Sequence, residues 1–417
     1  MPSPFRSLTS RQRHAFAACF LGWSLDAFDY FLLVFCVSAV AADFRVKQTE
    51  VAAALSVTLM FRPVGAFVFG MMADRFGRRP TLMFNIACYS VLELACAFAG
   101  SMHTLFILRA LFGIAMGGEW GVGAALALES LPAEGRGFFS GLLQEGYVVG
   151  SMLAALLYLL FPTLHGTGMF TAWRVLFVIG AVPSLSLLLL LRKVEESPAW
   201  LVRHSVLRVR IVRSLRSRVV EVLNYLPSLL ALTVLMTAFM AFSHGTQDLY
   251  PTFLKVDHGI RGVTLSAIAI VGNVGAVFGG IWFGSYSERV GRRRAIITAA
   301  LLSIPMIPLW AWSHTVVMLA VGGFLMQFMV QGAWGVIPVH LNEMSPPAVR
   351  AIFPGLAYQL GNVLSSRNSV LQAAAATKYF GGRFAPVLAI TVVVVALIVV
   401  VVTALGREAK GADLSTL

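Results

Sequence analysis

Long apolar runs recur along the chain and define its predicted elements. Runs close to the ~20 residues that a helix needs to cross a bilayer begin near Ala15, Thr49, Thr81 and Thr104, and a valine-rich run follows Val387. We count twelve such crossings. The first run is too long for a cleaved signal and lacks a small-residue cleavage pattern after it, so we expect the amino terminus to be retained. The pattern predicts an all-α integral membrane protein.

Composition agrees with this assignment. Of the 417 residues, 58% are hydrophobic and only 12% are charged, and the mean hydropathy is +0.81, far above the range of soluble proteins. The four cysteines lie inside apolar runs without metal-ligand spacing. We therefore expect no disulfide framework, no metal site and no cofactor, and no constellation of nucleophile and base indicates an enzyme.

The formal net charge of +13 raises the question of a nucleic-acid partner. Most of the 32 basic residues, however, fall in loops that would share one side of the membrane with both termini. This is the positive-inside asymmetry, so we expect no nucleic acid and predict a multi-pass protein of a bacterial inner membrane with both termini in the cytoplasm. The basic run Arg203 to Arg218 is either a solvated face or a contact with anionic lipid.

An internal repeat divides the chain. "GMMADRFGRR" begins at Gly70 and "GSYSERVGRRR" at Gly284, and the same offset aligns "ESLPAEGRGFFSGL" from Glu129 with "EMSPPAVRAIFPGL" from Glu343. We predict a six-helix bundle over residues 1–191, a cytoplasmic linker over 192–225 and a second bundle over 226–417. Two like-oriented bundles with a substrate site between them are typical of one class of secondary transporter.

The pattern G-x-x-x-[DE]-R-x-G-R-R, present in both halves, resembles the loop signature of the major facilitator superfamily and implies its fold of two pseudo-symmetric six-helix bundles. A small glycine permits close helix approach, and the acid pairs with basic groups in a latch that opens as the halves rock. We assign a gating role to these residues: Gly70, Asp74, Arg75, Gly77, Arg78, Arg109, Glu129, Arg136, Gly284, Glu288, Arg289, Gly291, Arg292, Glu343 and Arg350.

Ionisable residues inside the first half form a second set of candidates, because each costs about 2.5–3.5 kcal/mol at a helix centre. Acids outnumber arginines in this set: Asp26, Asp29, Glu93, Glu119 and Glu145 against Arg62 and Arg109. The excess acid is expected of a proton-coupled carrier. Asp26 and Asp29 share a helical face, and we expect them to carry the coupled proton, with Arg62 beside them or binding an anionic substrate; the alternative is a static ion pair.

Two further acids of that set have a structural interpretation. We expect Glu93 and Glu119 to be satisfied by backbone groups at a helix start or by Arg109.

The second half carries a different polar cluster, "SHGTQDLYPT" from Ser243, where the repeat places Met240 opposite Asp26. His244 and Asp248 are four residues apart and face the same way, so the acid can hold the imidazole tautomer. We assign proton coupling to His244 and Asp248 and substrate binding to Arg62, Ser243, His244, Thr246, Gln247, Asp248 and Arg367. The alternative is a polar helix end in water.

These segments resemble the sialate:proton symporter family of the major facilitators, which includes Jen-type lactate and pyruvate permeases. The similarity covers the membrane portion, including "WSLDAFDYFLL", "RALFGIAMGGEWG" and "SHGTQDLYPT". The family signature N-x-x-[ST]-H-x-[ST]-Q-D-x-x-x-T is matched through Thr252, and its residues are implicated in substrate and proton handling. Met240 replaces the leading Asn, which removes a carboxamide that binds polar substrates.

The resemblance implies a function. We expect a monomeric symporter that moves a small organic anion with a proton by alternating access, most of all a monocarboxylate such as lactate or pyruvate. Symport of sialic acid, a dicarboxylate or an aromatic acid is the first alternative. A nutrient sensor that has the transporter fold but does not cycle is the second.

Overall fold

The computed structural model describes residues 6, 8–160, 171–207, 220, 223–412 and 414, and these residues form a helical protein, as predicted. The helices of the first half are α1 (Ser10–Phe44), α2 (Gln48–Phe76), α3 (Arg78–Ala97), α4 (Met102–Gly117), α5 (Glu119–Ser130), α6 (Arg136–Gln144), α7 (Gly146–Leu160) and α8 (Ala172–Leu191). Helix α9 (Pro198–Leu207) follows in the predicted linker. Residues 208–219, which contain most of the basic run predicted from the sequence, lie outside the described ranges.

The second half repeats this order with more interruptions. Its helices are α11 (Leu226–Gln247), α12 (Tyr250–Val256), α13 (Gly262–Val290), α14 (Arg292–Ser303), η3 (Ile304–Met306), α15 (Ile307–Ala311), α16 (Val316–Gly335), α17 (Ile337–Met344), η4 (Pro347–Val349), α18 (Phe353–Ser365), α19 (Asn368–Tyr379) and α20 (Ala385–Leu405).

Eleven helical stretches within the described residues are long and apolar enough to cross a membrane. The remaining predicted crossing is the pair α18 and α19, which are separated by Ser366 and Arg367. Together these stretches account for the twelve crossings expected from hydropathy. The interruption places polar residues at the point where the helix breaks, which membrane proteins tolerate beside a water-filled cavity.

The glycine that the two repeated loops share is required by the backbone conformation of the turn. Gly77 between α2 and α3 has a φ of 108°, and Gly291 between α13 and α14 has a φ of 98°. These values lie in a region that side chains with a Cβ atom rarely adopt. A glycine at each turn therefore lets the long helix reverse directly into the next one.

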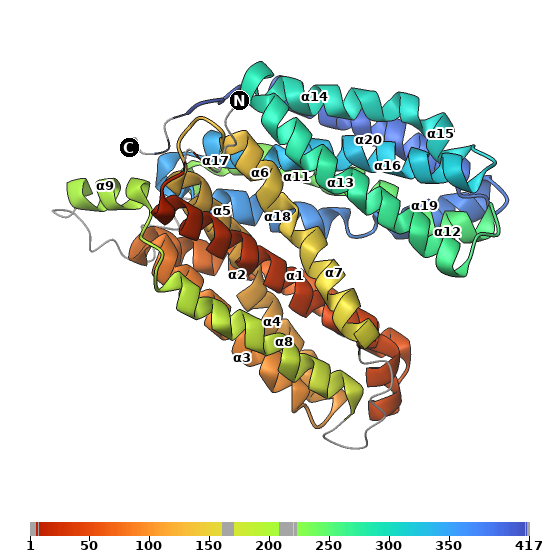
Figure 1. The fold of residues 1–417 in the computed structure, drawn as a ribbon, viewed down its shortest axis with the longest axis horizontal. Helices are drawn as coiled ribbons and strands as arrows, with labels where there is room; N and C mark the ends of the chain where they lie inside the picture. Colours follow the sequence, from red (N-terminus) through yellow and green to blue (C-terminus); the bar gives the residue numbers. More distant parts are fainter. Residues whose placement is uncertain are drawn as a thin grey trace.

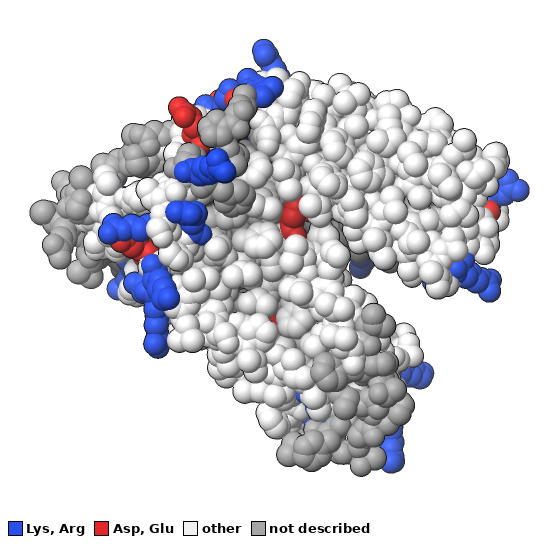
Figure 2. All heavy atoms as spheres, in the orientation of Figure 1, with Lys and Arg blue, Asp and Glu red and all other residues white. Residues whose placement is uncertain are grey.

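The two halves meet near one end of the molecule and diverge toward the other (Figure 1). Both termini, α9 and α17 lie at the closed end, which we call the terminal end; the opposite end is the open end. Figure 2 shows a V-shaped cleft between the halves at the open end, and basic side chains that gather at the terminal end. The structure is thus open to one side and closed to the other.

Glycines make the closed contact possible. A Cβ atom on Gly141 of α6 would overlap the carbonyl oxygen of Gly280 of α13, and one on Gly121 of α5 would lie 2.8 Å from the Cα of Gly355 of α18. Close helix approach at small residues is the usual way in which membrane helices associate. The halves therefore touch backbone to backbone at the terminal end.

Candidate functional site

Aromatic side chains from both halves pack together between the bundles. Tyr358 of α18 stacks on Trp120 of α5 with ring centroids 4.4 Å apart, and it contacts Trp23 of α1 at 6.2 Å and Trp334 of α16 at 5.8 Å. Tyr147 of α7 stacks on Trp23 at 5.8 Å. We call Trp23, Trp120, Tyr147, Trp334 and Tyr358 the aromatic floor. Neither half forms this floor without the other.

Arg62 and Asp26 form a buried ion pair beside this floor. Arg62 Nη2 lies 3.1 Å from Asp26 Oδ2, and both side chains are at most 4% exposed. The guanidinium also lies 5.8 Å from the centre of the Tyr30 ring. Asp26 Oδ1 and Arg62 Nε have no hydrogen-bond partner among the described residues. The pair thus keeps one free acceptor and one free donor.

Asp29 contacts a different helix from Asp26, although the two share one side of α1. Ser184 of α8 donates a hydrogen bond of 3.0 Å to Asp29 Oδ2, and Asp29 is fully buried. Gly180 of α8 lets the two helices approach here, because a Cβ at that position would lie 2.5 Å from the side chain of Leu32. The two aspartates therefore have separate environments, which the spacing in the sequence does not reveal.

The other buried acids of the first half differ in whether they have a partner. Arg109 pairs with Glu93 at 3.1 Å with both side chains fully buried, and its guanidinium lies 4.8 Å from the ring centres of Phe112 and Phe177. The expectation that Arg109 satisfies Glu93 is met. The same expectation is wrong for Glu119, since both of its carboxyl oxygens are buried and have no partner among the described residues. The start of α5 does not turn its N–H groups toward that side chain.

His244 and Asp248 interact on the last turn of α11. His244 Nδ1 lies 3.2 Å from Asp248 Oδ1, and Ser369 of α19 donates to Asp248 Oδ2 at 2.7 Å. Each of the paired side chains is about a third exposed, at 36% and 37%. Asp248 therefore links the end of α11 to the start of α19.

Glutamines of α16 extend this cluster into a chain of hydrogen bonds. Gln331 Nε2 donates to Ser243 Oγ at 3.0 Å, and Gln247 Nε2 donates to Gln327 Oε1 at 2.7 Å. Gln327 Nε2 in turn donates to Thr246 Oγ1 at 3.4 Å. Sequence reasoning did not single out Gln327 and Gln331. The available signal was two amides four residues apart inside an otherwise apolar run, "FLMQFMVQGAWG".

Three other residues assigned from the sequence occupy distinct positions. Arg367 is exposed at the break before α19 and has no ion pair within the described part of the chain. Met240 is 3% exposed and packs in the hydrophobic core. Thr252 lies half-buried in α12.

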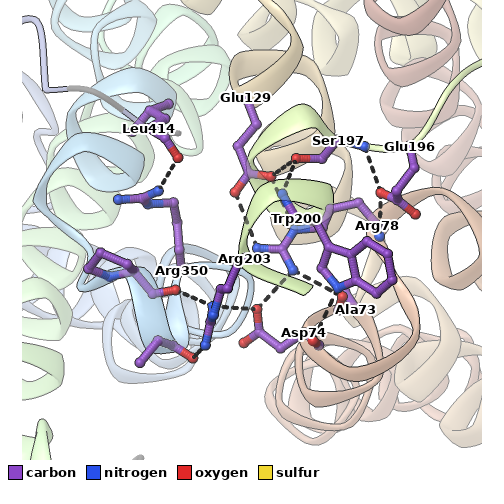
Figure 3. A network of polar contacts seen from close by, with 12 residues as sticks. Ala73, Asp74, Arg78, Glu129, Glu196, Ser197, Trp200, Arg203, Arg350 and Leu414 are labelled. Atoms are coloured by element: carbon purple, nitrogen blue, oxygen red, sulfur yellow. Dashed lines mark hydrogen bonds and ion pairs between the residues drawn. The ribbon is translucent and has the colours of Figure 1, made fainter. Parts of the chain in front are cut away.

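The predicted gating residues form two matching clusters at the terminal end. Arg78 bonds Asp74 at 2.9 Å and Glu129 at 3.1 Å and 3.2 Å (Figure 3). Arg292 bonds Glu288 at 3.0 Å and Glu343 at 3.0 Å and 3.1 Å. The sequence repeat relates the two clusters residue by residue. Arg78 makes two hydrogen bonds to Glu129, and Arg292 makes two to Glu343. Both pairs thus have the bidentate geometry that makes arginine–carboxylate pairs strong.

Two further acids, which sequence reasoning missed, complete these clusters. Glu196 accepts from the backbone N–H of Arg78 at 2.9 Å, and Glu408 accepts from that of Arg292 at 3.1 Å. Burial raises the pKa of Glu196 above its ordinary value, although the N–H groups around it act in the opposite direction. Burial also acts to raise the pKa of Glu408, but the backbone N–H groups of residues 292, 293 and 410 outweigh it, and that pKa is lowered. Each acid thus caps a helix start.

Several contacts tie the halves together at the terminal end. Arg203 of α9 donates to the carbonyls of Pro347 and Ala348 in the second half (Figure 3). The backbone N–H of Gly137 donates to Glu288 Oε1 across the interface. A backbone carbonyl of the tail also accepts from Arg136 of the first half at 3.0 Å. A second tail carbonyl accepts from Arg350 at 2.7 Å within the second half.

The other predicted gating residues lie around these clusters. Gly70 packs against the backbone of Ile352, and Gly284 against that of Gly137. Arg75 and Arg289 are exposed, and Arg75 lies over the ring of Phe76. No group of three or more His, Cys, Asp or Glu within the described ranges is arranged to hold a metal ion.

Comparison with known proteins identifies a family and several relatives of this chain. The family model described as "Major Facilitator Superfamily" matches residues 19–363. A carboxylic acid transporter protein homolog of Saccharomyces cerevisiae is 26% identical and aligns over 90% of this chain and 63% of its own length. The sialic acid transporter NanX of Escherichia coli is 25% identical over 98% of this chain and 96% of its own. A probable 4-methylmuconolactone transporter of Cupriavidus pinatubonensis is 29% identical over 88% of this chain and 84% of its own length.

Solved structures agree on the fold. The proton:xylose symporter XylE bound to 6-bromo-6-deoxy-D-glucose superposes with a TM-score of 0.75 at 18% identity, over 97% of this chain and 98% of that one. The human organic anion transporter MFSD10 gives a TM-score of 0.68 at 14% identity, over 94% of this chain and 100% of that one. At these identities the likeness concerns the arrangement of helices alone.

Proposed function

We propose, since the chain belongs to the major facilitator superfamily, that it is a proton-coupled symporter of an organic carboxylate. The fold and the relatives are those of transporters of organic acids and not of enzymes. The observation that carries the proposal is the buried Arg62–Asp26 ion pair. A cation held by one carboxylate is released when that carboxylate takes up a proton.

The exchange of partners at Arg62 supplies the coupling. While Asp26 is ionised, Arg62 is neutralised and has little affinity for an anion. A proton on Asp26 leaves the guanidinium without a counter-ion in a site of low dielectric, where an incoming carboxylate is strongly attracted. Because neither the proton nor the anion is favoured alone, the two bind together. One proton with one monoanion is an electroneutral load, so a pH gradient suffices to drive uptake.

The polar cluster of the second half completes the binding site. In the second half, hydroxyl and amide groups for a substrate come from Ser243, Gln247, Gln327 and Gln331. The indole N–H groups of Trp23 and Trp334 are buried without a partner among the described residues, and a substrate on the aromatic floor would satisfy them. His244 and Asp248, at the exposed margin, would pass protons between water and the site.

Alternation between the ends follows from the two sets of contacts. Substrate enters from the open end, the halves close over it there, and the two arginine clusters and the glycine contacts loosen at the terminal end. We place the terminal end in the cytoplasm because basic side chains gather there (Figure 2). The proposal assigns no partner chain and treats the protein as a monomer in the inner membrane.

For the substrate we propose a monocarboxylate such as lactate or pyruvate. Sialic acid is the second candidate, because the sialic acid transporter NanX aligns over nearly the full length of both chains and the chain of amides can bind several hydroxyl groups. Both substrates carry the carboxylate that Arg62 would hold. They differ in how many of the glutamines they occupy.

The test is uptake of labelled lactate, pyruvate, sialate and a dicarboxylate into proteoliposomes with an imposed inward pH gradient. We expect acid-stimulated accumulation of one of these anions and its loss in Arg62→Gln. Arg174→Gln is the matched control, since Arg174 pairs with Asp43 at 3.2 Å outside the cleft. If no organic anion accumulates in response to the gradient, the symport proposal is wrong.

A further inference from the structure

Glu145 is a buried acid without a role in the mechanism above. It lies at the junction between α6 and α7 and is 2% exposed. Both of its carboxyl oxygens are buried and have no hydrogen-bond partner within the described residues. The preceding residue, Gln144, accepts from the indole of Trp120 at 3.3 Å, so the junction adjoins the aromatic floor. A buried polar group left unpaired requires a physical explanation.

The carboxyl group occupies the interface between the halves. Gly137, Gly141 and Glu145 follow one another at intervals of four residues and so lie on one face of the helix. That face packs on α13, where Gly284 contacts Gly137 and Gly280 contacts Gly141. A Cβ atom on Gly280 would collide with Glu145 Oε1. The side chain of the first half therefore fills a notch that a glycine leaves in the second half.

Charged groups from the second half do not neutralise it. On α13, Glu288 lies eight residues beyond Gly280, about 12 Å along the helix, and is bonded to Arg292. His340 of α17 is buried and makes its backbone contacts within its own helix. Helix α16, whose Gln331 carbonyl lies beside Gly280, carries no charged residue.

Charged groups from the first half are engaged elsewhere. Arg136, at the start of α6, donates to the carbonyls of Leu131 and Ala412. Asp26 of α1 pairs with Arg62, and Tyr147 of α7 stacks on Trp23. Glu119 of α5 packs against Gly22 and Gly123 inside its own half.

An ionised carboxylate in this position has neither a counter-ion nor hydrogen-bond donors, and burying a charge in that way is costly. Separation of α6 from α13 removes the cost, because it admits water to the carboxyl group. The two conformations of the terminal end therefore differ in the protonation that they favour at this residue. Its protonation and the closing of that end are linked.

We propose that Glu145 is a proton-binding site that latches the terminal end: it is neutral while the halves are closed there and ionises when they part. On opening, the O–H bond of the carboxyl group breaks and the proton passes to water at the terminal end. On closing, the carboxylate takes a proton back from the same side. This proton is distinct from the one that travels with substrate, and acid on the terminal side favours the closed conformation.

The proposal rests on the proposed function only in requiring that the terminal end opens, so its test uses neither substrate nor gradient. Spin labels on Ala133→Cys and Arg294→Cys, both exposed positions at the terminal end on opposite halves, report the separation of the halves in the purified full-length protein. Between about pH 5 and pH 9 we expect the short distance to dominate in acid and the long one to grow in alkali. One linked proton changes the closed-to-open ratio by up to about tenfold per pH unit.

Variants at Glu145 test whether this residue causes the change of the closed-to-open ratio with pH, which we call the slope. Glu145→Gln is expected to keep the terminal end closed at every pH and so to lose the slope. Glu145→Leu is a second neutral variant if the first does not fold. Glu145→Asp, which still ionises, is expected to retain it. Glu119→Gln, equally buried and unpaired but within one half, is the matched control and is expected to keep the wild-type slope. A flat response in the wild type, or a wild-type slope in a neutral variant, would overturn the proposal; failure of acid-driven uptake would overturn only the symport.

Discussion

At the residue scale, the proposed transport site depends on how few partners its charged groups have. Arg62 bonds one carboxylate oxygen of Asp26, and the second oxygen of that acid has no partner among the described residues. A fully bonded pair would be a static element of the core. We therefore expect the pair with one bond to exchange its partner for a proton or an anion.

Removal of Asp26 tests this pair. Asp26→Asn leaves Arg62 buried without a counter-ion, which costs about 3–5 kcal/mol, so we expect a lower melting temperature. The double variant Asp26→Asn/Arg62→Gln is expected to recover most of that stability while remaining unable to accumulate substrate. Equal destabilisation of the single and double variants, measured by thermal unfolding in detergent, would contradict the argument.

Exchange and accumulation separate the roles of the two aspartates. If Asp26 or Asp29 carries the coupled proton, its Asn variant is expected to exchange substrate across the membrane but not to accumulate it. The measurement is counterflow compared with pH-driven uptake in the same proteoliposomes. Loss of both activities to the same extent would indicate a structural role, which for Asp29 would be its contact with Ser184.

The paired residues of α11 give a second prediction at this scale. Asp248→Asn removes the negative charge and replaces one of the two oxygens that contact His244 and Ser369 with an NH2 group. We expect initial uptake to fall by about tenfold, the effect of losing one charge-assisted hydrogen bond. Ser366→Ala is the control, since Ser366 bonds only the carbonyl of Val363 at the same helix break. Wild-type uptake by Asp248→Asn and by His244→Ala would remove this cluster from the mechanism.

At the element scale, the crossing of α6 and α13 decides whether the terminal end closes. Gly141 and Gly280 bring two backbones into contact, and neither position has space for a methyl group. The same elements carry Gly137, whose N–H bonds Glu288 across the interface. Close packing of this kind has two discrete arrangements, touching or apart, because overlap cannot be accommodated gradually.

A single added methyl group tests the crossing. Gly141→Ala would overlap the carbonyl of Gly280, and overpacking of about 1–3 kcal/mol shifts the equilibrium away from the closed terminal end by roughly tenfold or more. Gly272→Ala on α13 is the matched control, because its Cβ would meet its nearest atom at an ordinary 3.7 Å. The distance between spin labels on Ala133→Cys and Arg294→Cys measures the opening, and equal distances in the two glycine variants would contradict the prediction.

At the scale of the whole molecule, the halves share a gating scaffold and differ in their polar contents. The Arg78 and Arg292 clusters correspond one to one, and each is capped by an acid that follows the last helix of its half. The first half holds buried ion pairs, whereas the second holds an imidazole, a carboxylate and a chain of amides. This difference agrees with the proposal that both halves move together while the two sets of polar groups have separate roles.

The charge distribution predicts the orientation of the molecule in the membrane. With basic side chains gathered at the terminal end, we expect a fluorescent protein fused after the carboxyl terminus to fluoresce in intact bacteria and an alkaline phosphatase fusion at the same point to be inactive. A phosphatase fused within the loop at Asp257, at the open end, is expected to be active. The reverse pattern would invert the transport direction proposed here.

The sequence by itself determined the helices, the repeat and the gating clusters. A run of apolar residues crosses a bilayer because hydrocarbon leaves no other way to satisfy the backbone, so hydropathy alone predicts the crossings. The repeated loop fixes which residues correspond, and Asp74, Arg78 and Glu129 meet as their counterparts do. The sequence also selected Asp26, Arg62, His244 and Asp248, since charge within an apolar run is rare.

Only the tertiary structure decided which of these groups are paired. Asp26 and Asp29 are three residues apart and yet contact α2 and α8 respectively, Glu93 has a partner and Glu119 has none, and Glu145 lies against a glycine of the other half. Gln327, Gln331 and the aromatic floor become a site only when α16 and α18 lie beside the first half. Partnership depends on the distance between helices remote in sequence, and spacing along one helix holds no information about that distance.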